Sequence, residues 1–158
     1  MSIAVFPGSF DPVTVGHVDI IKRASTVFEK VVVAITPNPG KSGSEFTVEE
    51  RLELLRDAVS DIENVELSVC TCSVLVEYCR SIGATVMVRG IRSGSDVEYE
   101  SMLEQVNIRL APEIQTVYLI SRPEHAFISS SLVRQLISTG ISIEGLVPNA
   151  DHKYFKRG

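Results

Sequence analysis

One histidine near the start of the chain follows a glycine turn, a position from which a side chain can act on a phosphate group. His17 ends the segment Phe6-Pro-Gly-Ser-Phe-Asp-Pro-Val-Thr-Val-Gly-His. Gly8 allows the backbone to turn sharply and to approach a ligand closely, because it has no Cβ. A helix that begins here aims free N–H groups and the positive end of its dipole at an anion. The pattern predicts an anion site, although a histidine that only caps or packs at the helix start would fit the same position.

Further cationic and hydroxyl side chains occur after other apolar runs of the chain. Lys41 is the only cation in a loop rich in Pro, Gly and Ser, and Arg89 and Arg92 flank a glycine after the apolar run 85–88. Serines occupy positions 129–131, where a helix is expected to begin. Such side chains are suited to bind phosphate groups.

Each of these groups also has a plainer explanation. Lys41 could be a solvated loop lysine, and the two arginines could lie on the surface or pair with Asp96 and Glu98. The serines could be no more than a helix cap, since serine is favoured there for that reason alone. A serine cap and an anion site are compatible. Whether these groups form an anion site therefore depends on whether the fold places them together.

Apolar runs and segments of helical spacing alternate along the whole chain. Strands are expected at residues 3–6, 30–36, 65–69, 85–88 and 116–120. Helices are expected after residue 17, from the capping box Thr47-Val-Glu-Glu50, at 74–82, from Asp96 to Leu110, and from Ser129. In the second of these helices, the leucines face the core and Arg51 is expected to point mostly outward.

Five such alternations over short connections predict one α/β domain, residues 1–158, with a Rossmann-like parallel five-stranded sheet and helices on both faces. Ligands of such sheets bind beyond the carboxyl ends of the strands, at the switch point of the strand order. We expect the polar residues described above to meet at this edge. A cationic cluster in a chain of net charge −5 indicates a small polyanionic ligand.

Composition excludes several other classes of protein. The net charge of −5 argues against a general nucleic-acid binder, so no nucleic-acid partner is expected. No apolar stretch approaches the roughly 18 residues of a membrane span, and the N-terminus lacks the features of a signal peptide. We therefore expect a cytoplasmic protein with no membrane partner. Three cysteines predict no disulfide framework, and Cys70-x-Cys72 has no further ligands at a zinc spacing.

Four segments of the sequence resemble a known superfamily. Thr14-Val-Gly-His17 is similar to the H/T-x-G-H motif of the nucleotidyltransferases, which transfer a nucleoside monophosphate from a triphosphate, and Ile128–Arg134 to their I-S-S-[ST]-x-x-R motif. Two segments resemble one family within this superfamily, the bacterial phosphopantetheine adenylyltransferases. They are residues 7–17, of the form P-G-S-F-D-P-x-T-x-G-H, and Arg89–Glu100, of the form R-G-[IL]-R…D-x-E-Y-E. With Phe46–Arg51, the resemblance extends from residue 3 to about 148.

The resemblance implies a reaction and a set of site residues. The adenylyl group of ATP would pass to 4′-phosphopantetheine by in-line attack of the acceptor phosphate on the α-phosphate, giving dephospho-coenzyme A and pyrophosphate. His17 would stabilise the transition state, and Lys41 and Arg92 would assist. The acceptor would contact Ser9, Lys41, Leu75 and Arg89. ATP would contact Ser9, Phe10, His17, Gly90, Ile91, Arg92, Glu100, His125, Ala126, Phe127, Ile128, Ser129, Ser130 and Ser131.

The resemblance also implies Mg²⁺ bound to the triphosphate, with few protein ligands and no dedicated metal site, and a homohexamer built as a dimer of trimers. Two positions depart from the family pattern. His125 stands where an aromatic residue, often Trp, is familiar, and the loop 40–45 is particular to this chain in length and content. Packing against the nucleotide at His125 is therefore an open question.

The implied nucleophile is a phosphate oxygen that is ionised at neutral pH, so the reaction needs positioning and charge neutralisation rather than a general base. Two other functions are compatible with parts of the sequence. A sister nucleotidyltransferase could act on nicotinamide mononucleotide or glycerol 3-phosphate, but segment 89–100 argues against it. A nucleotide sensor without turnover would need the glycine loop, but not His17 together with two separate anion sites.

Overall fold

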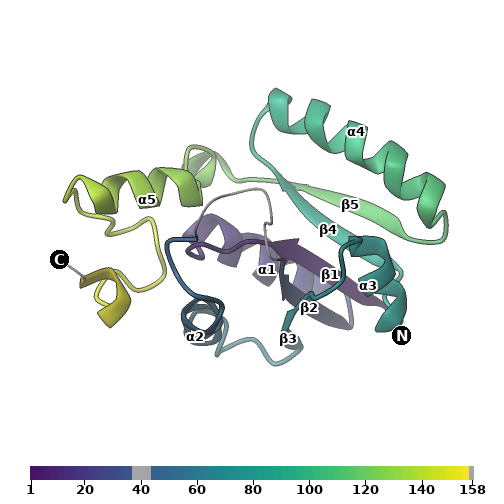
Figure 1. Cartoon of the computed structure of the whole chain (residues 1–158), viewed down its shortest axis with the longest axis horizontal. Coiled ribbons are helices and arrows are strands. Elements are labelled where there is room, and N and C mark those ends of the chain that lie inside the picture. The colour runs from purple at the N-terminus through teal and green to yellow at the C-terminus, as the bar shows by residue number, and fades with distance from the viewer. Residues whose placement is uncertain (37–43, 157–158) are drawn as a thin grey trace.

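The sheet has five parallel strands in the order β3-β2-β1-β4-β5 (Figure 1). The structure is a computed structural model, and it describes residues 1–36 and 44–156. The central strand β1 pairs with β2 on one side and with β4 on the other, so the strand order reverses between β1 and β4. The predicted α/β sheet is confirmed. Its strands are β1 (Ile3–Gly8), β2 (Lys30–Ile35), β3 (Val65–Val69), β4 (Val86–Ile91) and β5 (Gln115–Ile120).

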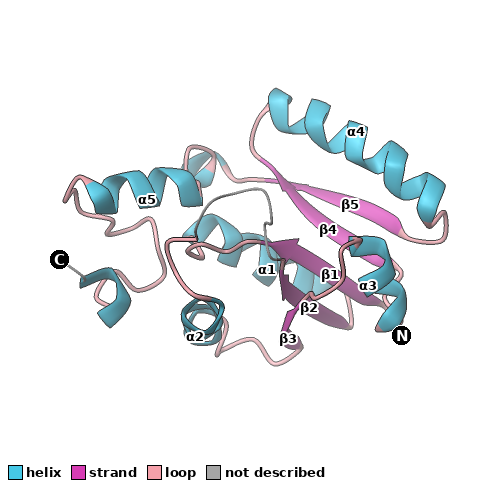
Figure 2. Cartoon of the chain, viewed as in Figure 1, coloured by secondary structure: helices cyan, strands magenta, loops and turns pink. Residues whose placement is uncertain are grey.

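Helices follow the strands in strict alternation (Figure 2). Two of them begin with a capping box, in which Thr14 or Thr47 accepts a backbone N–H and the side chain three residues later accepts the cap N–H. None of the helices in the described ranges is long and apolar enough to cross a membrane. The helices are α1 (Val15–Val27), α2 (Val48–Ala58), α3 (Leu75–Ser81), α4 (Gly94–Leu110) and α5 (Ser130–Ser138), with 3-10 turns η1 (Pro123–His125) and η2 (Lys153–Lys156).

The hydrophobic core lies on both faces of the sheet. In β1, Ala4 and Phe6 pack towards α1 and α2, whereas Val5 packs towards α3. Strand β2 alternates in the same way, as expected for a parallel strand that is covered on both sides. Only Glu100 is buried in α4, which lies over β4 and β5 (Figure 1). A third small cluster holds α5 and the C-terminal segment together.

Two local expectations were wrong in ways that matter for the site. Strand β4 continues to Ile91, because β5 pairs with it through Ile120, so Arg89 and Gly90 lie within the strand rather than after it. Helix α4 has Ser93 as its N-cap, and the carboxylate of Asp96 instead accepts the backbone N–H of Arg92 at 2.9 Å.

Arg51 is a third correction, because it is buried rather than turned outward. It is only 4% exposed. The reason is helical geometry: Arg51 lies three and four residues before Leu54 and Leu55, which puts it on the same face of α2 as these two core residues.

Candidate active site

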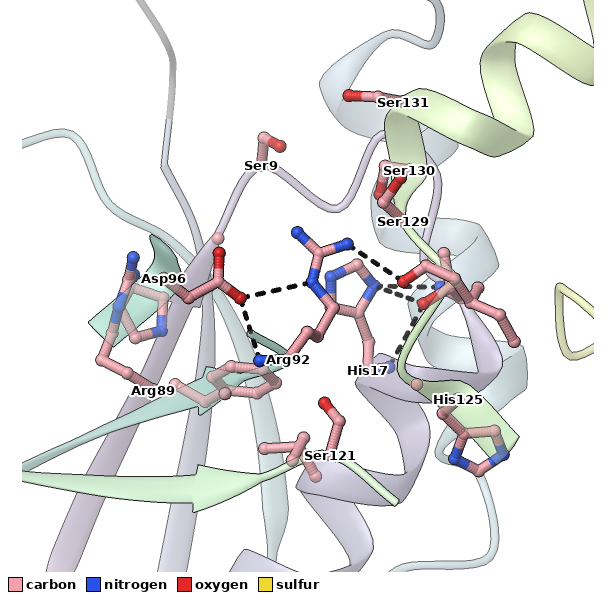
Figure 3. Close-up of a pocket in the computed structure, with 18 of the residues that line it drawn as sticks. Ser9, His17, Arg89, Arg92, Asp96, Ser121, His125, Ser129, Ser130 and Ser131 are labelled. Carbon is pink, nitrogen blue, oxygen red and sulfur yellow. Dashed lines mark hydrogen bonds and ion pairs between the residues drawn. The ribbon is translucent and has the colours of Figure 1, made fainter. Parts of the chain in front are cut away.

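A cleft of about 360 Å³ opens at the carboxyl ends of β1 and β4, where the strand order reverses (Figure 3). Its walls come from the loop after β1, the start of α1, the end of β4, the first turns of α4 and the start of α5. This is the position at which open parallel sheets bind ligands. The site predicted from the sequence therefore has a physical cavity.

His17 lies in the wall of this cleft, in the first turn of α1. Its Nδ1 atom accepts the backbone N–H of Thr14 at 3.0 Å, so histidine takes the part of glutamate in the capping box. Since an N–H can only donate, Nδ1 is unprotonated and the neutral ring carries its proton on Nε2. Phe10 supports the ring from one side, with centroids 4.9 Å apart. The fold thus fixes both the tautomer and the orientation of the imidazole.

The protonation state of His17 is also set by its surroundings. The pKa of His17 is lowered from 6.5 to about 4, chiefly because burial removes water from the charged ring and secondly because the Arg92 cation repels it. At neutral pH His17 is therefore an uncharged donor through Nε2. The surroundings of His17 therefore favour the neutral form of the imidazole.

We expect no titration of His17 between about pH 8 and pH 5.5. The NMR signal of its Cε1 proton should begin to shift only as the pH approaches 4. Because the unfolded chain binds a proton near pH 6.5 and the native state does not, the free energy of unfolding should rise with pH between about 4 and 6.5. In Arg92→Met, loss of the cation should raise the pKa of His17. A His17 signal that titrates near pH 6.5 in the native protein would contradict this assignment.

Arg89 projects from β4 into the cleft and is tied to Glu100 of α4. Its Nε and Nη2 atoms donate to the carboxylate at 2.7–3.1 Å. Glu100 is buried, and its charge is matched by this cation. Among the described residues, Nη1 of Arg89 has no partner, so it remains available to an anion. The plainer explanation of an ion pair is thus partly right, with Glu100 in place of Glu98.

Arg92 bridges the two sides of the cleft (Figure 3). Its Nη1 donates to the carbonyl of Ile128 at 3.2 Å, and its Nε lies 3.6 Å from the Asp96 carboxylate. The guanidinium therefore joins the start of α4 to the segment before α5. An anion that enters the cleft would meet a cation already held in place between these two elements.

The start of α5 forms the opposite wall. Ser129 is the N-cap, as predicted, and its hydroxyl accepts the N–H of Leu132 at 3.1 Å. The backbone N–H groups of Ser130 and Ser131 have no acceptor in the described part of the chain. A helix start with free N–H groups facing a cleft is suited to hold phosphate oxygens.

Most of the residues predicted from the sequence meet in this cleft. Phe10 does not line it but lies behind His17, and Leu75 lines an adjoining cavity. Ile91, Ala126 and Phe127 do not line the cleft, and Lys41 lies outside the described residues. The predicted residues that line the cleft are Ser9, His17, Arg89, Gly90, Arg92, Glu100, His125, Ile128, Ser129, Ser130 and Ser131.

The structure adds residues that the sequence prediction left out of the site. Asp96 and Tyr99 line the cleft together with Glu100, because residues three and four apart share one face of α4. Helical spacing in the segment 89–100 was a signal that could have identified them. Thr14 and Arg134 also line the cleft. Thr14 could have been found as the N-cap that accepts from His17.

The ring of His125 points away from His17 and Arg92 (Figure 3). Its Nδ1 atom is buried without a hydrogen bond in the described structure, 3.9 Å from a carboxylate oxygen of Asp19 on α1. Asp19 also pairs with Arg122 at 3.0 Å. In this arrangement His125 packs η1 against α1, and its ring does not face the cleft.

A second cavity of about 170 Å³ adjoins the cleft and shares Arg89 and Glu100 with it. Its other walls are Leu75 of α3, Met87 of β4 and residues of α4 and β5. The described residues contain no group of three or more His, Cys, Asp or Glu side chains that could hold a metal ion. The site is therefore a cationic cleft with a smaller, partly apolar extension.

Comparison with known proteins agrees with this geometry. The Cytidylyltransferase-like family matches residues 5–136. A phosphopantetheine adenylyltransferase from Caldanaerobacter subterraneus subsp. tengcongensis is 42% identical over 149 residues, which cover 94% of this chain and 92% of that protein. One from Symbiobacterium thermophilum is 50% identical over 145 residues, 92% of this chain and 88% of that protein.

Solved structures share the fold at low sequence identity. A putative nicotinate-nucleotide adenylyltransferase from Vibrio parahaemolyticus superposes with a TM-score of 0.68 at 19% identity, covering 93% of this chain and 87% of that one. At such identity the likeness concerns the fold alone. The sequence relatives decide the family, since they match nearly the whole chain at 42–50% identity. This chain therefore belongs to the phosphopantetheine adenylyltransferase family of nucleotidyltransferases.

Proposed function

We propose that this enzyme transfers the adenylyl group of ATP to 4′-phosphopantetheine, giving dephospho-coenzyme A and pyrophosphate. The observation that carries the proposal is the placement of His17, a neutral donor of fixed tautomer, between two cationic sides of one cleft. Arg89 and the adjoining cavity form one side. Arg92 and the start of α5 form the other. The cleft can thus hold two phosphorylated substrates facing each other.

The acceptor occupies the side of Arg89. Its phosphate takes the free Nη1 of Arg89 and the hydroxyl of Ser9, and its uncharged tail extends towards Leu75 and Met87. The attacking phosphate oxygen is already an anion at neutral pH, so no residue has to remove a proton. Holding two anions in line is the main catalytic task, because their mutual repulsion opposes the approach.

ATP occupies the side of Arg92 and α5. The free N–H groups of Ser130 and Ser131 and the guanidinium of Arg92 bind its phosphate oxygens. Nε2 of His17 donates to the α-phosphate as charge accumulates there during the attack. Pyrophosphate leaves with the bonding electrons of the P–O bond, and the acceptor phosphate takes its place on the α-phosphorus.

Magnesium is expected to enter with ATP. The carboxylates that line the cleft, Asp96 and Glu100, are already engaged with arginines. The residues present therefore fit a metal bound mainly through the phosphate oxygens of ATP, where it would neutralise part of the triphosphate charge. The protein side chains still set the position of both substrates.

Pyrophosphate release across a small acceptor panel tests the proposal. The enzyme is incubated with MgATP and with 4′-phosphopantetheine, nicotinamide mononucleotide or glycerol 3-phosphate. We expect release with 4′-phosphopantetheine alone. Preference for another acceptor would identify a sister enzyme, and ATP binding without release in any mixture would identify a nucleotide sensor. Either result would overturn the proposal.

The role of Lys41 in binding the acceptor phosphate remains a prediction from the sequence. In Lys41→Ala, loss of one charge-assisted bond to phosphate should weaken transition-state binding of the acceptor by roughly 1.5–3 kcal/mol. The melting temperature should hardly change. Lys156→Ala is the matched control, because Lys156 is exposed and lies on the C-terminal turn η2. Steady-state kinetics with 4′-phosphopantetheine that match those of this control would refute the role of Lys41.

That the protein is a cytoplasmic homohexamer also remains a prediction. We propose that α4 forms contacts between the subunits. Met102 and Val106 are 60% and 52% exposed and lie one turn apart on α4. Met102→Glu combined with Val106→Glu should dissociate the oligomer, because charges are costly to bury in an apolar interface. Light scattering measures the mass, with Gln105→Glu as the control. A wild-type monomer at micromolar concentration would refute the assembly.

A further inference from the structure

Arg51 is a buried cation that donates a hydrogen bond to the backbone of the loop after β1. Its side chain is 4% exposed, and it forms no ion pair with a carboxylate in residues 1–36 and 44–156. Its Nη1 instead donates to the carbonyl of Ser9 at 2.8 Å, and its Nε donates to the carbonyl of Thr47 at 3.4 Å. Burying an unpaired charge is costly, so these bonds to the backbone must compensate for it.

The bond to Ser9 fixes the direction of the next N–H group. A trans peptide is planar, and its C=O and N–H point to opposite sides. Ser9 lines the cleft, whereas Arg51 lies outside it on α2. With the Ser9 carbonyl drawn towards Arg51, the N–H of Phe10 points away from α2, to the side on which Ser9 lines the cleft, while Phe10 itself is buried behind the lining residues. This N–H has no acceptor among the described residues, so it is free to bind a phosphate oxygen.

The loop needs such support because Phe10 has a left-handed backbone, with φ of 46°. This conformation is unfavourable for a non-glycine residue and persists only where its surroundings impose it. Arg51 holds the residue before Phe10. On the other side, Arg134 donates to the carbonyl of Asp11 and Ser130 to the carbonyl of Pro12, each at 2.7 Å.

Phe10 connects Arg51 to His17. The ring of Phe10 is 1% exposed and packs edge-on against the imidazole of His17. A change in the Ser9–Phe10 peptide would therefore move both a phosphate-binding N–H and the ring that supports the catalytic histidine.

We propose that Arg51 is a positioning residue for the transfer reaction. By holding the Ser9 carbonyl it aims the Phe10 N–H at the phosphate chain of ATP and keeps the Phe10 ring against His17. This inference rests on the proposed function for its kinetic readout, but not for its binding readout.

The test compares Arg51→Met with Arg56→Met, an exposed arginine on the same helix. The protein is labelled with ¹⁵N-phenylalanine, which gives six amide signals, and a Phe10→Leu variant identifies that of Phe10. Addition of MgATP without acceptor should shift the Phe10 signal in the wild type and in Arg56→Met. The shift should be lost or much smaller in Arg51→Met. kcat per folded molecule should fall about 10–100-fold in Arg51→Met only, which is the effect of losing a charge-assisted hydrogen bond.

The acceptor KM separates positioning from a general loss of structure. We expect the acceptor KM to change by a smaller factor than kcat, because Arg89 still binds the acceptor phosphate, even though Arg51 also holds the backbone of Ser9, whose hydroxyl faces that phosphate. If Arg51→Met does not fold, Arg51→Lys is used, since lysine keeps the cation but lacks the planar fork. Its Phe10 signal should differ from that of the wild type and its kcat should be lowered. A Phe10 response and kcat equal to those of the wild type in whichever variant folds would overturn the inference. Lack of turnover in the wild type would refute the proposed function, while the Phe10 response to MgATP would still test Arg51.

Discussion

His17→Ala is expected to lower kcat about 10²–10³-fold while leaving ATP binding nearly intact. The reason is that Nε2 of His17 meets the α-phosphate when charge accumulates there, so the bond is stronger in the transition state than in the ground state. Single-turnover kinetics of pyrophosphate release measure the chemical step, and calorimetry with MgATP measures binding. The variant should remain folded, since His17 contributes little area to the core.

Two further variants separate the two nitrogen atoms of the imidazole. His17→Asn can still accept the N–H of Thr14 but has no donor at the position of Nε2, so it should be as slow as alanine and more stable. His17→Gln can place an amide N–H near that position and should recover part of the rate. Near-normal turnover in His17→Ala would refute the mechanism. Unfolding of His17→Ala, together with a folded His17→Asn of near-normal turnover, would mean that His17 acts only as a cap.

The sequence was sufficient to predict the sheet, its helices and the edge at which the site lies. Apolar runs such as Lys30–Ile35 are continuous because both faces are buried, and Thr47 and Ser129 have the chemistry of helix caps. These are local signals, and tertiary packing agrees with them. His17 lines the same cleft as Arg89 and Arg92 because the strands that carry or precede these residues are parallel neighbours, so their carboxyl ends lie at one edge of the sheet.

Other features could not be predicted because they depend on which partner a charged side chain finds. Arg51 has the composition of a surface residue, yet it reaches a carbonyl in another loop. Glu100 lines the cleft, where its contact with ATP stays a prediction, but its pairing with Arg89 was not expected from the sequence. The direction of the His125 ring depends on its packing near α1, which no motif encodes. Sequence spacing identifies the side chains near a site but does not assign their partners.

The ion pair of Arg89 and Glu100 allows the structural part of Arg89 to be separated from its part in binding. In Arg89→Met, the buried Glu100 carboxylate loses its partner, and the free energy of unfolding should fall by about 2–3 kcal/mol. This value lies below the full cost for a buried pair because Arg89 is 27% exposed. The acceptor phosphate also loses the guanidinium, so kcat/KM for 4′-phosphopantetheine should fall about 10²-fold.

The double variant Arg89→Met with Glu100→Gln decides between the two effects. Glutamine removes the uncompensated charge, so denaturant unfolding should show most of the lost stability restored. The acceptor kcat/KM should stay low, because no cation faces its phosphate. Recovery of kcat/KM together with stability would mean that Arg89 only neutralises Glu100, and the acceptor phosphate would then have to bind elsewhere in the cleft. Because one variant restores the fold without restoring the guanidinium, the stability and the kinetics of the double variant report separately on the two roles of a single side chain.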